Sequence, residues 1–144
     1  RVRNEPMLRM SYMPSDFHPI LLVLGTPEQL LILADALEAF SQRGGKAVLN
    51  DAGVFSTDTR VSLEEIDLEG ERKPGLWQVE KGATDLVWRL PKNYAWIFSN
   101  EVANLANSGE PAGSVTLECD VLSEIRVKVS IGEWEEDYLT DDFR

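Results

Sequence analysis

The chain has 144 residues, of which 14 are basic and 25 acidic, so its net charge at pH 7 is −11. Its apolar share of 43% is ordinary for a globular protein, and its length suits one domain with its own core. No stretch of the sequence is apolar for the length that a membrane span needs. The charge argues against nucleic acid and anionic membranes as partners and favours a basic protein. Plain solubility is the alternative explanation of the charge.

The first residues do not resemble a secretory signal, and the single cysteine, Cys119, excludes an internal disulfide. We therefore expect a reducing cytoplasm, although a periplasmic domain without disulfides would have a similar composition. Residues 1–16 contain prolines on both sides of three methionines and no helix-start signal, so we expect a flexible N-terminal arm. Residues 17–144 are then a single domain.

The region from residue 20 to residue 45 predicts a strand followed by a helix. Ile20–Leu24 is apolar at every position, which is typical of a central strand covered on both faces or of one covered by an oligomer contact. Thr26, Pro27 and Gln29 provide an N-cap, a first helical residue and the second half of a capping box. The predicted core stripe of this helix is Leu30, Leu33, Ala34, Leu37 and Phe40, and Gly44 and Gly45 end it.

The middle of the chain predicts short strands at 46–49, 60–66, 76–80 and 85–90, with loops at 50–59 and 67–75. In the last of these strands Leu86, Trp88 and Leu90 share one face. The alternation in 60–66 predicts a strand but leaves its register open.

A second helix is predicted from Pro91 to about Asn107, with a core stripe of Tyr94, Ile97, Phe98, Val102 and Leu105. Residues 114–119 and 124–131 then predict a hairpin. In its second strand Ile125, Val127, Val129 and Ile131 alternate with polar residues.

The two halves of the sequence repeat the same order of elements: a strand, a helix opened by proline, and two strands. Pro27 corresponds to Pro91 and Gly44 to Gly109, which suggests a duplicated βαββ unit, with chance similarity as the alternative. Because strands follow one another without helices between them, we predict an α+β fold. It has a mainly antiparallel sheet of about six or seven strands with two helices on one face.

One residue in each helix lies nearly opposite the core stripe, Ile32 in the first and Trp96 in the second. Either the two helices pack side by side with these residues in the crevice, or Trp96 is an exposed anchor for a partner.

The sequence contains no phosphate-binding loop, nucleophile elbow or metal-ligand spacing. His18 is expected at a strand start or on the surface, and Cys119 as a small hydrophobic residue rather than a reactive thiol. We expect no cofactor and no metal, and an enzyme is the less favoured interpretation. The alternative to be kept is a ligand pocket between sheet and helices near Trp77, Trp88 and Tyr94.

The C-terminal segment 132–144 mixes acidic and aromatic residues. Its apolar residues either dock the segment on the domain or form an acidic-aromatic surface for a basic protein. The predicted partner-binding residues are Trp96, Glu133, Trp134, Glu135, Glu136, Asp137, Tyr138, Asp141 and Asp142. We predict a non-catalytic interaction domain, such as an inhibitor or immunity-type protein that neutralises a basic toxin. A small-ligand-binding domain or small enzyme, and a self-associating structural module or homodimer, are the alternatives.

Overall fold

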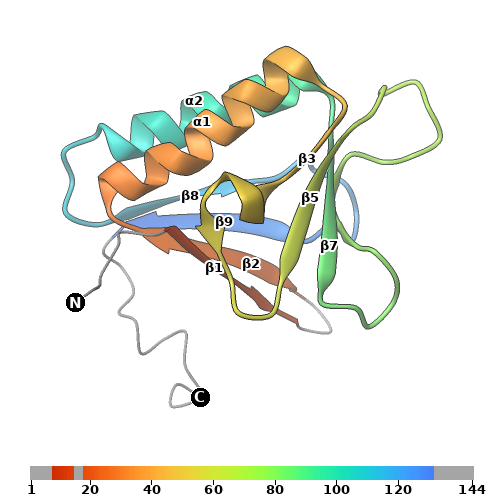
Figure 1. The fold of residues 1–144 in the computed structure, drawn as a ribbon, viewed down its shortest axis with the longest axis horizontal. Coiled ribbons are helices and arrows are strands. Elements are labelled where there is room, and N and C mark those ends of the chain that lie inside the picture. Colours follow the sequence, from red (N-terminus) through yellow and green to blue (C-terminus); the bar gives the residue numbers. More distant parts are fainter. Residues whose placement is uncertain (1–7, 15–17, 132–144) are drawn as a thin grey trace.

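The computed structural model describes residues 8–14 and 18–131. It contains two mixed β-sheets and two long helices, α1 (Pro27–Arg43) and α2 (Lys92–Ala106), which lie side by side along one side of the sheets (Figure 1). The α+β class is therefore confirmed. None of the helices in the described ranges is long and apolar enough to cross a membrane.

The first sheet has five strands in the order β4-β1-β2-β9-β8. Its strands are β1 (Leu8–Met13), β2 (Ile20–Gly25), β4 (Val54–Phe55), β8 (Gly113–Leu117) and β9 (Arg126–Ile131). β1 and β2 are antiparallel, as are β8 and β9, whereas β2 and β9 run parallel. The predicted hairpin of β8 and β9 is confirmed.

The second sheet has four strands in the order β3-β5-β7-β6. Its strands are β3 (Lys46–Val48), β5 (Arg60–Glu65), β6 (Gly75–Gln78) and β7 (Asp85–Leu90). The outer pairs are antiparallel and the central pair, β5 and β7, is parallel. A single bridge between Leu76 and Ile125 joins this sheet to the start of β9.

The expectation of one mainly antiparallel sheet of six or seven strands is therefore only partly met. Each sheet has a parallel pair at its centre, and its two strands come from segments far apart in the sequence. Alternation of apolar residues reports which face of a strand is buried, and it carries no information about the direction of the neighbouring strand.

The two sheets have the same construction. The hairpin β1–β2 pairs with the hairpin β8–β9, and the hairpin β6–β7 pairs with β3–β5. Apart from the short strand β4, which lies between β3 and β5 and pairs with β1, each half is ββαββ along the chain, and each sheet takes one antiparallel strand pair from each half. The correspondence seen in the sequence therefore has a counterpart in the topology, while descent by duplication stays a prediction.

The start of α1 is built as its sequence predicts. The Thr26 side chain accepts a hydrogen bond from the Gln29 amide, and the Gln29 side chain accepts one from the Thr26 amide. The buried residues are the five of the predicted stripe, Leu30, Leu33, Ala34, Leu37 and Phe40. Gly44, at φ 68°, supplies the backbone conformation that ends the helix.

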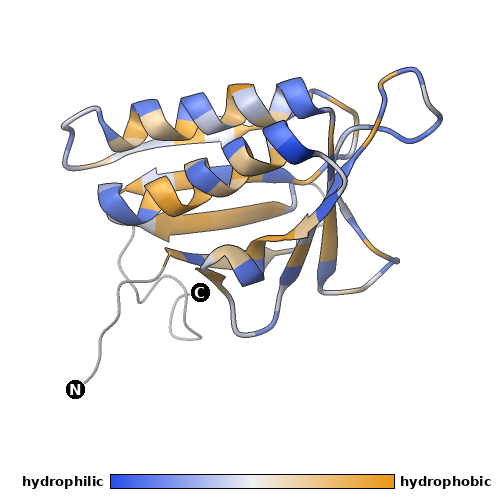
Figure 2. Cartoon of the chain, turned by 45° about the horizontal axis from the view of Figure 1, so that its top comes forward, coloured by the Kyte–Doolittle hydropathy of each residue, from blue (hydrophilic) through white to orange (hydrophobic). Residues whose placement is uncertain are grey.

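The predicted core stripe of α2 is partly wrong. The buried residues are Ala95, Phe98, Ser99, Val102 and Ala106, while Ile97 points outward. α2 packs against α1 as well as against the sheets, and a close helix–helix contact favours small residues. Ser99 lies in this contact, where its Oγ donates to the Ala34 carbonyl at 2.7 Å. Figure 2 shows the apolar side of each helix turned toward the sheets.

One continuous core lies between the helices and the inner faces of both sheets. Trp88 is at its centre, 1% exposed and stacked on Phe98 with ring centroids 5.9 Å apart. The register of β5 is now settled, because Val61 and Leu63 both face this core.

The expected flexible arm at residues 1–16 is wrong for residues 8–13. These residues form β1 between β4 and β2, and Leu8 and Met10 are buried in the core. The relevant pattern is the alternation of Leu8, Met10 and Tyr12, all in contact with the core, rather than the three-residue spacing of the methionines. Residues 1–7 lie outside the described part. The loop predicted at 50–59 also contains structure, namely the short 3₁₀ helix η1 (Leu49–Ala52) and strand β4.

Candidate interaction surfaces

The outer face of α2 presents two large apolar side chains to solvent. Trp96 is 56% exposed and Ile97 is 43% exposed. The exposed residues between and around them are Asn93, Asn100 and Asn104, while Lys92 and Glu101 lie one helical turn from Trp96 and Ile97, at the edges of this face. In a chain of net charge −11, a tryptophan and an isoleucine among asparagines, with the charges at the edges, have the composition of the centre of a protein interface. We call Trp96, Ile97 and the three asparagines the α2 face.

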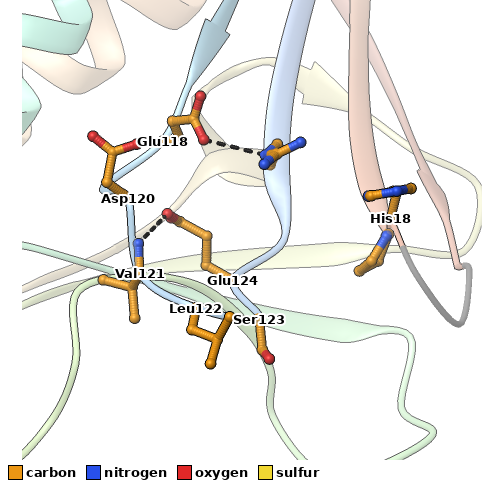
Figure 3. Close-up of a pocket in the computed structure, with 9 residues that line it drawn as sticks. His18, Glu118, Asp120, Val121, Leu122, Ser123 and Glu124 are labelled. Carbon is orange, nitrogen blue, oxygen red and sulfur yellow. Dashed lines mark hydrogen bonds and ion pairs between the residues drawn. The ribbon is translucent and has the colours of Figure 1, made fainter.

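The equivalent side of α1 is covered by the chain itself. Ile32 is partly buried, and the backbone of Gly53 lies so close that a Cβ there would be 3.2 Å from Ile32 Cγ2. Gly53 belongs to the η1–β4 segment, which is inserted between β3 and β5. The segment in the corresponding place of the second half, residues 118–125, lines a cavity together with His18 (Figure 3). Its Glu124 lies against Gly75. The α2 face therefore has no cover like that of Ile32 within the described residues.

The loop between β8 and β9 is organised by a buried carboxylate. Glu124 is 9% exposed and accepts hydrogen bonds from the Cys119 amide at 3.0 Å and the Val121 amide at 2.9 Å. Asp120 and Ser123 have φ values of 61° and 72°, so the loop turns through two left-handed residues. Its apolar tip, Leu122, is 87% exposed.

This loop, His18 and Arg126 surround a cavity of about 560 Å³ (Figure 3). Its wall groups are already engaged with one another, since Glu118 pairs with Arg126 at 3.1 Å and Glu124 caps backbone amides. The arrangement braces the loop.

Cys119 lies at the start of this loop and is partly buried. Burial, and then the negative charges of Glu124, Asp120 and Glu118, raise the pKa of its thiol to about 12. At neutral pH the group is a protonated thiol, which is a poor nucleophile. The interpretation of Cys119 as a small hydrophobic residue therefore agrees with its surroundings.

A second cluster of charges lies on the outer face of the second sheet. Glu64 Oε1 accepts from Arg72 Nη1 at 2.6 Å and Arg89 Nε at 3.2 Å, and Lys46 Nζ is 3.9 Å from Oε2. Partial burial on its own would raise the pKa of Glu64. The Arg89 hydrogen bond and the positive charges of Arg72, Arg89 and Lys46 outweigh it and lower the pKa. The cluster ties β3, β5 and β7 to the loop that carries Arg72.

The three residues of the predicted ligand pocket are not brought together. Trp77 pairs with Val87 and Leu76 with Trp88, so Trp77 and Trp88 lie on opposite faces of the second sheet. Trp88 is sealed in the core, and Tyr94 is partly buried with its ring 6.5 Å from Phe98.

Of the predicted partner-binding residues, the structure places Trp96, on the α2 face. The other eight, Glu133, Trp134, Glu135, Glu136, Asp137, Tyr138, Asp141 and Asp142, lie outside the described residues. Within the described ranges no group of acidic, histidine and cysteine side chains is arranged to hold a metal ion. Sequence reasoning missed Ile97, because it was assigned to the core stripe, and it missed Glu124, which no motif distinguishes from its acidic neighbours.

Comparison with known proteins gave no match, whether to protein-family models, to curated proteins or to solved structures.

Proposed function

We propose that this protein is a non-catalytic interaction domain that binds a basic protein through the α2 face. The observation that carries the proposal is the exposure of Trp96 and Ile97, which are 56% and 43% exposed. The core side of α2 is formed by other residues, so neither side chain is needed there. Large apolar side chains on an uncharged patch are the usual energetic centre of an interface.

The charge of the chain specifies the kind of partner. A net charge of −11 repels acidic surfaces and accelerates encounter with basic ones, while an uncharged centre avoids the desolvation of buried ions. In our proposal the negative charge of the whole chain supplies this attraction, and the α2 face supplies the contact. An inhibitor or immunity-type protein acting in the cytoplasm on a basic toxin or nuclease is the concrete form of the proposal.

We also propose that the two halves of the chain arose by duplication of one unit. If both ββαββ halves descend from one unit, then Ile32 and Trp96 occupy related positions, and the η1–β4 insertion has covered only the first. The second position is then free to contact another molecule.

The test is a titration of the full chain against purified basic toxins and nucleases at several salt concentrations. We expect binding that weakens by at least about tenfold between low and high salt, because screening removes the long-range attraction. Trp96→Ala should weaken it further, whereas Leu122→Ala, which truncates an even more exposed apolar residue elsewhere, should not. Absence of binding to every basic candidate, or binding that ignores salt, would contradict the proposal.

Self-association is the competing outcome. A second copy cannot pair with β2, because both edges of this strand are already bonded, to β1 and to β9. If sedimentation shows a dimer that Trp96→Ala dissociates, the α2 face joins two copies, and the structural-module alternative replaces the proposal.

A further inference from the structure

Part of the outer face of the first sheet is buried, although no described helix or strand packs on it. In β2, Leu21 and Val23 point into the core, so Leu22 and Leu24 point to the opposite face. The helices α1, α2 and η1 all contribute to the core that contains Leu21 and Val23 (Figure 1). Yet Leu22 is 2% exposed and Leu24 is 6% exposed.

The same strip continues onto the next strand. Ser130 of β9 is paired with Leu24, is 0% exposed, and its Oγ is buried without a hydrogen-bond partner. Farther along the sheet the burial stops, because Ser114 and Thr116 of β8 are exposed. The buried strip therefore runs along β2 and β9. A chain segment that packs lengthwise on these two strands would bury this set of residues.

We propose that the chain's own C-terminal segment, residues 132–144, docks on this strip. The segment begins directly after Ile131, the last residue of β9, and its first residue is glycine, which permits a reversal of the chain. Thirteen extended residues reach about 40 Å, about twice the length of a six-residue strand, so the segment is long enough to run along the strip.

The composition of the segment matches the strip. Its apolar residues, Trp134, Tyr138, Leu139 and Phe143, are suited to cover the two leucines. The basic residues of β1 and β9 on this face are Arg9, opposite Leu24, Lys128, opposite Leu22, and Arg126, opposite Ile20. Arg126 pairs with Glu118. The segment itself carries six acidic residues, the sign that suits a basic face.

The other two segments that the structure does not describe, residues 1–7 and 15–17, are less suited to cover the strip. Residues 15–17 are three in number and connect the far ends of β1 and β2, away from Leu24. Residues 1–7 precede Leu8 in the sequence, and Arg9 is opposite Leu24, but they carry Arg1 and Arg3, whose charge does not suit a face that already holds Arg9. The C-terminal segment is favoured by its charge, its aromatic residues and its length.

A cysteine placed in the strip tests the proposal. In the full chain with Cys119→Ser, Leu22→Cys should react with a small alkylating reagent far more slowly than Leu122→Cys, at the 87% exposed loop tip. Adding Trp134→Ala should raise the rate at position 22 by at least about tenfold, because opening of the segment becomes more frequent. Adding Trp96→Ala, which also removes a tryptophan but from α2, should leave the rate unchanged.

Three outcomes would overturn the proposal. One is an alkylation rate at position 22 that Trp134→Ala leaves unchanged. Another is a rate that rises instead on deletion of residues 1–7, which would assign the cover to the N-terminus. The third is a rate that rises on dilution, which would assign it to a second copy. None of these readouts involves a partner protein, so the test is independent of the proposed function.

Discussion

Replacement of Glu124 should loosen the β8–β9 loop by an amount that the structure allows to be worked out. In Glu124→Ala the Cys119 and Val121 amides lose the carboxylate that they bond at 2.9–3.0 Å. A hydrogen bond to a charged group contributes about 1.5–3 kcal/mol, and water can replace part of it in this half-open loop. We therefore expect a loss of about 2–3 kcal/mol for Glu124→Ala and about 1 kcal/mol for Glu124→Gln, which keeps one acceptor oxygen.

Gly75 provides the matched second perturbation. A Cβ on this residue would lie 2.7 Å from Glu124 Oε2, and its φ of 119° is unfavourable for any other residue. Gly75→Ala should therefore cost about 2–4 kcal/mol, part of it backbone strain and part of it displacement of the carboxylate. In the Glu124→Ala background the clash with the carboxylate is gone, and the backbone strain remains together with the 3.2 Å contact to the Cβ of residue 124, about 1–2 kcal/mol in all.

Urea denaturation of the four proteins at pH 7 gives the free energies of this cycle. The predicted result is a coupling of about 1–2 kcal/mol between positions 75 and 124. If the losses of unfolding free energy in the two single variants add up to the loss in the double variant, Glu124 does not pack against Gly75. That result would refute this account of the loop.

Three further predictions concern stability and reactivity. Glu64→Gln should cost about 1 kcal/mol at neutral pH, since two of its three partners, Lys46 and Arg72, are largely exposed and only Arg89 is partly buried. Because the folded pKa of Glu64 is lowered, this contribution is present above the unfolded pKa and is lost as the pH falls through the folded pKa. Urea curves of both proteins should therefore converge at acid pH, and a difference that persists would contradict this. Thr26→Ala should lower stability by about 1 kcal/mol through loss of the α1 cap, measured by thermal unfolding, with no loss as the contradicting result. Alkylation of Cys119 should stay slow at pH 8 and accelerate only toward its pKa of about 12, and rapid reaction at pH 8 would refute the assignment.

The sequence predicts local structure well wherever the signal is itself local. The cap at Thr26, the stripe of α1 and the apolar face of β9 are determined by neighbouring residues, and all three are confirmed, although Ser130 on the polar face of β9 is buried as well. The direction of β2 relative to β9 depends on a partner more than 100 residues away, which no periodicity records. For the same reason β1 was missed, since its burial depends on β2 and β4 on either side.

The candidate site was predictable in part. Trp96 stood out because it lies off the apolar stripe of its helix, and the structure places it in solvent. Ile97 could not be separated from the core by spacing alone, because the small residues Ala95 and Ser99 face α1 and turn Ile97 outward. The burial of Leu22 and Leu24 was visible as an apolar run at 20–24, but only the sheet pairing shows which of these residues face away from the core.

The central claim is that the α2 face binds a basic partner. The most direct test is calorimetric titration of a basic toxin or nuclease into the wild-type chain and into Trp96→Ala. The account predicts that the substitution weakens binding at least about tenfold while the unfolding free energy stays within about 0.5 kcal/mol of wild type, since the side chain is 56% exposed. Equal affinity of both proteins would contradict it.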